Sequence, residues 1–203
     1  MKTSDRITPR RRPGRPLSFD RDAALHAAML VFWRHGYEST SLGDLTAAMG
    51  VTPPSIYAAF GNKKALFLEA VRRYVGEPAV SERLIAEAAS ARAAARALLD
   101  SAAAGFTGTD TPRGCLLASA AAAVSSDAAD VQVELSAIRA AVVEQLSARL
   151  ARGVADGELD PSLDPAAAAS HVVAVIQGMS TLARDGATRA TLDSIVAQVM
   201  RGI

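Results

Sequence analysis

Two groups of side chains in the first third of the chain have the chemistry to bind phosphate. The first is a run of arginines, Arg10, Arg11, Arg12 and Arg15. Arginine carries a fixed positive charge and attracts polyanions. The second group combines hydroxyls with one ammonium group and consists of Thr40, Ser41, Thr52, Ser55, Tyr57 and Lys63. Because side chains of these types donate hydrogen bonds to phosphate oxygens, both groups predict a polyanionic partner.

The charge distribution indicates where that partner would bind. The net charge of the whole chain is only +1. Residues 1–75 contain 12 Lys/Arg against 6 Asp/Glu, whereas residues 76–203 contain 10 against 15. A cationic N-terminal part joined to an anionic remainder favours a polyanion at one end of the molecule.

The arginine run also contains a shape-specific signal. Gly14-Arg15-Pro16 stands among basic residues and is similar to an AT-hook, which lays arginines into a narrow A·T minor groove. A solubilising tail and phosphate attraction without any preference for shape are the alternatives. We therefore expect residues 1–17 to form a flexible arm that contacts DNA, and the A·T preference stays open.

Four helices are predicted between residue 18 and residue 76. Apolar residues at 25, 28, 29 and 32 share one face of the first helix, with Ser18 as its N-cap and Gly36 at its end. Ser41, with Asp44 three residues later, should cap a short second helix. Gly50 then makes a turn into a third helix. The fourth fades near residues 76–78.

The third helix begins with Thr52, Pro53, Pro54 and Ser55. Proline is tolerated there because the first N–H groups of a helix have no partner within it. Two short helices joined by a glycine turn form a helix-turn-helix, whose second helix enters the major groove with its N-terminal residues nearest the bases. The prolines would offer apolar contact, and the two hydroxyls could bond to DNA or simply cap the helix.

Two further residues, which follow the start of the third helix, are predicted to contact phosphate. Tyr57 follows the inward-facing Ile56 and so points away from the core. Lys63 opens the fourth helix, where free N–H groups and the helix dipole also favour an anion. The alternative is that both are ordinary solvated surface residues.

The pattern G-Y-E-S-T-S-L-x-x-L-x-x-x-x-G-V-T-x-x-S-I-Y-x-x-F-x-x-K-x-x-L, within residues 20–74, resembles the DNA-binding domain of TetR-type bacterial transcription regulators. The resemblance implies an all-helical homodimer that places two such domains on a palindromic operator, and a C-terminal domain that binds a small molecule. It also implies phosphate contacts by Tyr57, by Lys63 and by either Thr40 or Ser41.

The chain departs from the family pattern at three positions. Gly43 stands where many members carry an arginine that reaches DNA, and Ala58 and Ala59 replace the commoner aromatic residue and histidine. We therefore expect few direct contacts to bases, and a larger share of the affinity from the arm.

Five further helices are predicted in residues 77–203, over Val80–Ala104, from Gly114, over Ala129–Arg152, Pro165–Arg184 and Thr188–Met200. The fourth of these is apolar almost all round, so we expect it to pack on its own core and on a second copy. Leu192, Ile195, Val196 and Val199 should join that interface, and small residues Ala169, Gly178 and Ser180 would permit close approach. Alanine is too weakly hydrophobic for Pro165–Ala183 to be a convincing membrane span.

Cys115 is the most reactive side chain of this part. A helix start and the neighbouring Arg113 both favour a thiolate. The phrase Pro112-Arg113-Gly114-Cys115-Leu116 is similar to one in a subgroup of TetR-type regulators, some of which sense electrophiles or oxidants through cysteine. The alternative is a small buried apolar side chain, which is the commoner fate of a lone cysteine. Phe106, Cys115, His171 and Gln177 are the candidate ligand-binding residues.

These observations predict an all-α fold of about nine helices, with an arm at 1–17, a helix-turn-helix domain at 18–76 and a ligand-binding and dimerisation domain at 77–203. The expected function is a ligand-responsive DNA-binding repressor in the cytoplasm. A redox regulator acting through Cys115, and a helical enzyme or carrier, are the alternatives. We find no metal, cofactor or catalytic signature, so we expect neither an enzyme nor a cofactor.

Overall fold

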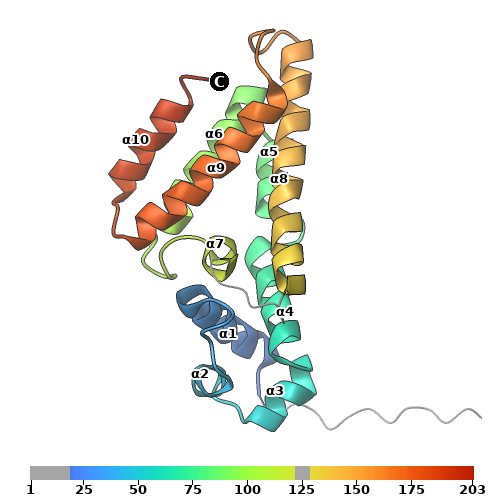
Figure 1. Ribbon diagram of the computed structural model, residues 1–203, viewed down its shortest axis with the longest axis vertical. Helices are drawn as coiled ribbons and strands as arrows, with labels where there is room; N and C mark the ends of the chain where they lie inside the picture. The colour runs from blue at the N-terminus through green and yellow to red at the C-terminus, as the bar shows by residue number, and fades with distance from the viewer. Residues whose placement is uncertain (1–18, 122–128) are drawn as a thin grey trace, which may run out of the picture.

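The computed structural model describes residues 19–121 and 129–203, and these two ranges are entirely helical, with loops between the helices (Figure 1). Ser18 and the arm residues Arg11, Arg12 and Arg15 lie outside these ranges. The helices are α1 (Arg21–His35), α2 (Leu42–Met49), α3 (Pro53–Phe60), α4 (Lys63–Val75), α5 (Val80–Ala86), α6 (Ala91–Phe106), α7 (Leu116–Ala121), α8 (Ala129–Ala155), α9 (Pro165–Arg184) and α10 (Arg189–Val199).

Helices α1–α4, called the head below, begin and end at local signals in the sequence. The N-cap of α1 is Asp20 and not Ser18 as predicted, because the Asp20 carboxylate accepts hydrogen bonds from the N–H groups of Asp22 and Ala23. The Ser41–Asp44 capping box predicted for α2 is present in both directions. Gly50 ends α2 at φ +65°, a left-handed conformation that glycine adopts without steric cost.

The core of the head is built around aromatic and aliphatic side chains that are almost fully buried. Phe32 of α1 packs edge-on against Phe67 of α4, with ring centroids 5.1 Å apart. Buried residues of α7 and α8 belong to the same core, namely Leu116, Val131 and Leu135. The four helices of the head therefore share one hydrophobic core with the nearest parts of the two helices above them (Figure 1).

The remaining helices, α5–α10, form the body, and here one prediction is wrong. The helix expected over Val80–Ala104 is two helices, α5 and α6, so the described residues contain ten helices. The break has a physical cause, because the Ser90 side chain accepts the N–H of Ala93 and starts a new helix. The N–H of Ala91, the first residue of α6, has no partner within the helix and donates to the Glu158 carboxylate at 2.6 Å. Alanine suits both faces of a helix, so the alanine-rich pattern does not reveal the interruption.

The body holds a second hydrophobic core, formed mainly by α6, α8, α9 and α10. Helix α9 packs against both α6 and α8, and α10 lies beside α6 and α9 (Figure 1). By length and composition α9 could cross a membrane, but several of its side chains, including Val172 and Met179, are buried in this core. The long helix α8 runs from the head to the far end of the body, so the two parts share a structural element.

Candidate nucleic-acid interface and ligand pocket

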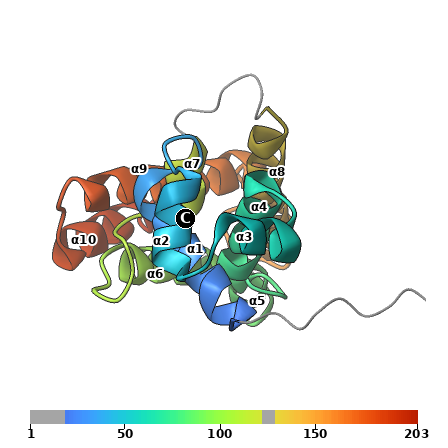
Figure 2. The same ribbon diagram turned by 90° about the horizontal axis from the view of Figure 1, so that it is seen from below.

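The end of the molecule farthest from the body is made by α2 and α3, which Figure 2 shows from below. Ile56 and Phe60 anchor α3 in the core of the head. The start of α3 is exposed at Thr52, Pro53 and Pro54, with Ser55 half-buried. Thr52 makes no side-chain cap, and its hydroxyl oxygen instead lies 3.0 Å from that of Ser55. The predicted residues thus lie together along one edge of α3, which combines two hydroxyl groups with two apolar proline rings.

Tyr57 and Lys63 flank this edge, and their side chains differ in exposure and in contacts. The Tyr57 side chain is exposed, with 48% of the residue open to solvent, as expected for a position off the core face. The Lys63 ammonium donates to the Glu38 carbonyl oxygen at 3.3 Å and lies 4.6 Å from the centre of the Tyr37 ring. Partial burial lowers the pKa of Lys63. Both contacts hold the ammonium near the link between α1 and α2.

Of the two alternatives at the start of α2, only Ser41 is accessible. Thr40 is 1% exposed, and its hydroxyl donates to the Gly36 carbonyl oxygen at 2.6 Å. Ser41 is exposed and is held in the capping box with Asp44. Gly43, which is exposed, leaves this part of α2 without a side chain. The exposed start of α2 therefore presents Ser41 and Asp44, and no positively charged side chain.

Three other cations of the head are engaged in ion pairs. Arg21 of α1 pairs with Glu69 of α4, and Arg73 at the end of α4 pairs with Asp22. Lys64 pairs with Asp130 at the start of α8. These pairs tie the outer helices of the head to each other and to the body. Helix α3 takes no part in them, because its sequence contains no charged residue.

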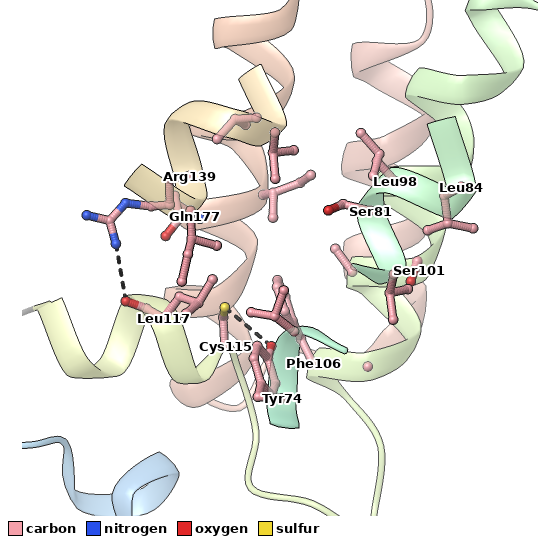
Figure 3. Close-up of a pocket in the computed structure, with 18 of the residues that line it drawn as sticks. Tyr74, Ser81, Leu84, Leu98, Ser101, Phe106, Cys115, Leu117, Arg139 and Gln177 are labelled. Carbon is pink, nitrogen blue, oxygen red and sulfur yellow. Dashed lines mark hydrogen bonds between the residues drawn. The ribbon is translucent and has the colours of Figure 1, made fainter. Parts of the chain in front are cut away.

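A cavity of about 410 Å³ lies between the head and the body. Its walls come from α1, α4, α5, α6, α8 and α9, with the loop before α7 at one end (Figure 3). Three of the four candidate ligand-binding residues line it, namely Phe106, Cys115 and Gln177. The fourth, His171, lies elsewhere, in a groove between α9 and α10.

Cys115 is buried at the centre of a network that connects several helices. Its N–H donates to the Ser180 hydroxyl of α9 at 2.8 Å, and the Tyr74 hydroxyl of α4 donates to its sulfur at 3.4 Å. The indole N–H of Trp33 in α1 donates to the carbonyl oxygen of Gly114 at 3.1 Å. Gly114 has φ +81°, and an added Cβ would lie 2.9 Å from the Ser180 carbonyl oxygen.

The structure changes the basis for a reactive Cys115. The guanidinium of Arg113 donates to the carbonyl oxygen of Ala187 and is exposed, so it is committed to the start of α10. The group that contacts the sulfur is the phenol of Tyr74. Burial, followed by the proximity of Cys115, raises the pKa of Tyr74, so this phenol remains a proton donor.

Trp33 and Tyr74 are pocket residues that the sequence did not single out. Their rings meet edge to face, with centroids 4.8 Å apart. Both belong to head helices, and the signal in the sequence for a role in the pocket is only that each has a polar atom which needs a partner when buried. Which partner it finds depends on the fold.

Comparisons with known proteins agree with this architecture. The family described as "Bacterial regulatory proteins, tetR family" matches residues 24–70, and "Tetracyclin repressor-like, C-terminal domain" matches residues 91–199. The HTH-type transcriptional repressor ComR of Escherichia coli (strain K12) is 38% identical over 190 residues, which cover 93% of this chain and 90% of ComR.

Solved structures extend the similarity to the whole fold. A cysteine-substituted mutant of the TetR family transcriptional regulator CifR, complexed with a 26-base-pair double-strand operator DNA, is 40% identical with a TM-score of 0.87, covering 93% of this chain and 98% of that chain. A TetR transcriptional regulator from Rhodococcus sp. RHA1 is 35% identical with a TM-score of 0.59, covering 91% and 98%. Both domains of this chain thus match one family over nearly their full length, and the chain belongs to the TetR family of bacterial transcriptional regulators.

Proposed function

We propose that this chain is a repressor that binds a palindromic operator as a homodimer in the cytoplasm and is released by a small molecule bound between head and body. The observation that carries the proposal is that side chains from the helices of the head line the pocket. Trp33 of α1 and Tyr74 of α4 line the cavity, and α4 begins with Lys63 beside the exposed edge of α3. A molecule in the cavity would therefore press on the helices that position α3.

The relatives support the DNA partner. CifR, similar in fold to this chain over almost its whole length, was solved on operator DNA. The exposed start of α3, Tyr57 and Lys63 supply hydroxyls and a positive charge of the kind that bind phosphate. Because α3 has no charged side chain, we infer that the arginine arm contributes a large part of the affinity.

Helices α9 and α10 support a dimer. Leu182 is 42% exposed, and an added Cβ at Gly178 would meet open space, so this position would permit close approach of a second helix. The groove between α9 and α10 is lined by His171, Val175 and Ile195. Of the small residues predicted for the interface, Ala169 and Ser180 are instead buried in their own protomer. A two-fold dimer through this face would present two copies of α3, as a palindrome requires.

Operator binding measured by fluorescence anisotropy at several salt concentrations tests this function. Lys63→Ala should weaken binding about tenfold and reduce the salt slope by about 1, the value for a single phosphate. Arg96→Ala, which removes a charge from α6 in the body, is the matched control and should bind as the wild type does. Deletion of residues 1–16 should flatten the slope further. Unchanged binding by both Lys63→Ala and the deletion would contradict the proposed DNA-binding face.

A redox response through Cys115 is the second candidate, and one observation favours it. The sulfur lies at the pocket wall, and its network reaches α1, α4 and α9. An oxidised or alkylated sulfur would no longer fit beside the Tyr74 hydroxyl, so the same head–body contact would change. Cys115→Ser should then keep operator binding and lose release by oxidants. Release by oxidants that persists in Cys115→Ser would exclude this candidate.

A further inference from the structure

We propose that the pocket takes an uncharged, mostly apolar molecule with one hydrogen-bond-accepting oxygen, such as a ketone, and that Tyr74 donates to this oxygen. This inference rests on the proposed function, because it names the class of molecule that the pocket recognises. It adds a specificity-determining residue, Tyr74, on a helix that begins at the DNA-reading end.

The size and the walls of the cavity favour an apolar body for the ligand. A volume of about 410 Å³ lies in the lower part of the range of about 300–1,000 Å³ that is usual for small-molecule pockets. Aliphatic and aromatic side chains from opposite sides line it, among them Leu84, Leu98, Phe106, Val142 and Ile176. Burying apolar surface against these walls is the main source of affinity that they can supply.

The charges around the cavity favour a neutral ligand. Among the described residues that line it, Arg139 is charged, and none is Asp or Glu. A cation would lose its hydration there without gaining a carboxylate, which is costly. The Arg139 guanidinium extends toward the Leu117 carbonyl oxygen, 3.5 Å away at the edge of the cavity, so an anion inside would not meet it directly (Figure 3).

Several polar side chains line the cavity, including Ser81, Ser101 and Gln177, and we assign the contact that orients the ligand to Tyr74. Its hydroxyl points along the cavity wall to the sulfur of Cys115, as Figure 3 shows, over a distance of 3.4 Å. A thiol sulfur is a weak acceptor, so a carbonyl oxygen within reach would take this hydrogen bond in its place. Burial raises the pKa of Tyr74 and keeps the phenol protonated, so it presents a donor and selects an acceptor. The edge contact with Trp33 fixes the ring that carries it.

The same exchange links recognition to the head. When the hydroxyl turns from Cys115 to a ligand oxygen, α4 gives up a hydrogen bond to the loop before α7. The loop stays bound to α9 through Ser180 and to α1 through Trp33. A ligand of the proposed class therefore changes one interaction of α4 directly, and α4 is the helix that follows α3.

The chain has a built-in reporter for the test. Trp33 is its only tryptophan and lines the pocket, so its fluorescence follows occupancy of the cavity in the full-length protein. Four probes share a phenyl ring and a similar alkyl chain: benzylacetone carries a ketone, butylbenzene no polar group, phenylbutyrate an anion and phenylbutylamine a cation. Each is titrated into the wild type, into Tyr74→Phe and into Cys115→Ala, and thermal melting establishes that each variant is folded.

We expect Tyr74→Phe to lose affinity for the ketone and not for the apolar probe. In Tyr74→Phe the affinity for benzylacetone falls about two- to tenfold, the worth of one net hydrogen bond, while that for butylbenzene changes less than about twofold. Cys115→Ala removes the competing acceptor and tightens benzylacetone binding about twofold. Phenylbutylamine binds more weakly than benzylacetone. Equal losses for benzylacetone and butylbenzene in Tyr74→Phe, tighter binding of either charged probe, or binding of none of the four overturns the proposal.

A parallel measurement of operator binding separates this inference from the proposed function. If benzylacetone binds as expected but leaves operator binding unchanged, the pocket chemistry stands and the release mechanism is wrong. If other molecules release the operator and Tyr74→Phe responds to them as the wild type does, the release mechanism stands and the role of Tyr74 is wrong.

Discussion

The head and the body obtain their structures in different ways. In the head, several helix boundaries have a local cause, namely the Asp20 cap, the Ser41–Asp44 box and the left-handed Gly50. In the body, alanine-rich helices contact residues that are far apart in the chain. At the start of α6, for example, the N–H of Ala91 donates to the carboxylate of Glu158. Short-range signals are therefore enough to identify a DNA-reading unit, whereas a ligand pocket depends on long-range packing.

The two regions nevertheless share side chains. Leu135 of α8 is part of the core of the head, and Trp33 and Tyr74 of the head line the pocket of the body. The boundary predicted after residue 76 divides the chain at the end of α4, but the packing crosses it. In the proposed mechanism, this overlap would let a molecule in the pocket act on α3.

The largest effect is expected from the core of the head. Phe32→Ala removes a ring that is 0% exposed and packs against Phe67, so it should lower the free energy of unfolding by about 3–5 kcal/mol. Urea denaturation followed by circular dichroism measures the loss. The control Val133→Ala, at a position 64% exposed on α8, should stay within about 0.5 kcal/mol of the wild type. Similar losses in the two variants would contradict the assignment of the core.

A substitution in α8 tests whether the body supports the head. Leu135 is fully buried against head residues, so Leu135→Ala should cost about 2–5 kcal/mol. The distinguishing measurement is hydrogen exchange, in which amides of α1 and α4 should lose protection together with those of α8. Protection lost in α8 alone would show that the head folds independently of it.

A substitution in the capping box tests whether local signals in the sequence stabilise the helices of the head. Ser41→Ala removes the side chain that accepts the N–H of Asp44, and the expected cost is about 1 kcal/mol. The free energy of unfolding from a urea titration is the measurement. Ser170→Ala, an exposed position inside α9, serves as a control and should be nearly neutral. A loss as large in the control would mean that the cap adds nothing specific.

The smallest effect concerns pH. A hydrogen bond from Arg21, with its charge, holds the pKa of Glu69 below the ordinary value of 4.5. Because the folded-state pKa is the lower one, this contribution is present above about pH 4.5 and is lost as the pH falls through the folded-state value. Glu69→Gln should therefore make stability less dependent on pH in the acid range. A profile identical to that of the wild type would show that the pair contributes nothing.

The sequence predicts the head well because its signals are local. The spacing of apolar residues, Gly36, Gly50 and the capping box are all visible without the fold, and the resemblance to the TetR family adds the expected contacts at Tyr57 and Lys63. The error over Val80–Ala104 has a physical reason, since a single serine cap at Ser90 divides a run of helix-favouring residues.

The pocket could be predicted only in part. Phe106, Cys115 and Gln177 lie in it, whereas His171 faces the groove between α9 and α10 because it is on another side of α9. Trp33 and Tyr74 belong to head helices, and their role in the pocket follows from how α1 and α4 pack against the loop at Cys115. No spacing rule encodes such a contact.

In the proposed mechanism a filled pocket weakens operator binding, and a substitution can fill the pocket without any ligand. Ala102 lines the cavity from α6, so Ala102→Phe should occupy part of it, whereas Ala104→Phe places the same ring on the exposed side of that helix. In fluorescence anisotropy with operator DNA, Ala102→Phe should bind about 5- to 150-fold more weakly, the usual size of coupling between two sites. Ala104→Phe should bind as the wild type does. Equal operator affinity in the two folded variants would contradict a coupling between the pocket and the DNA-reading helices.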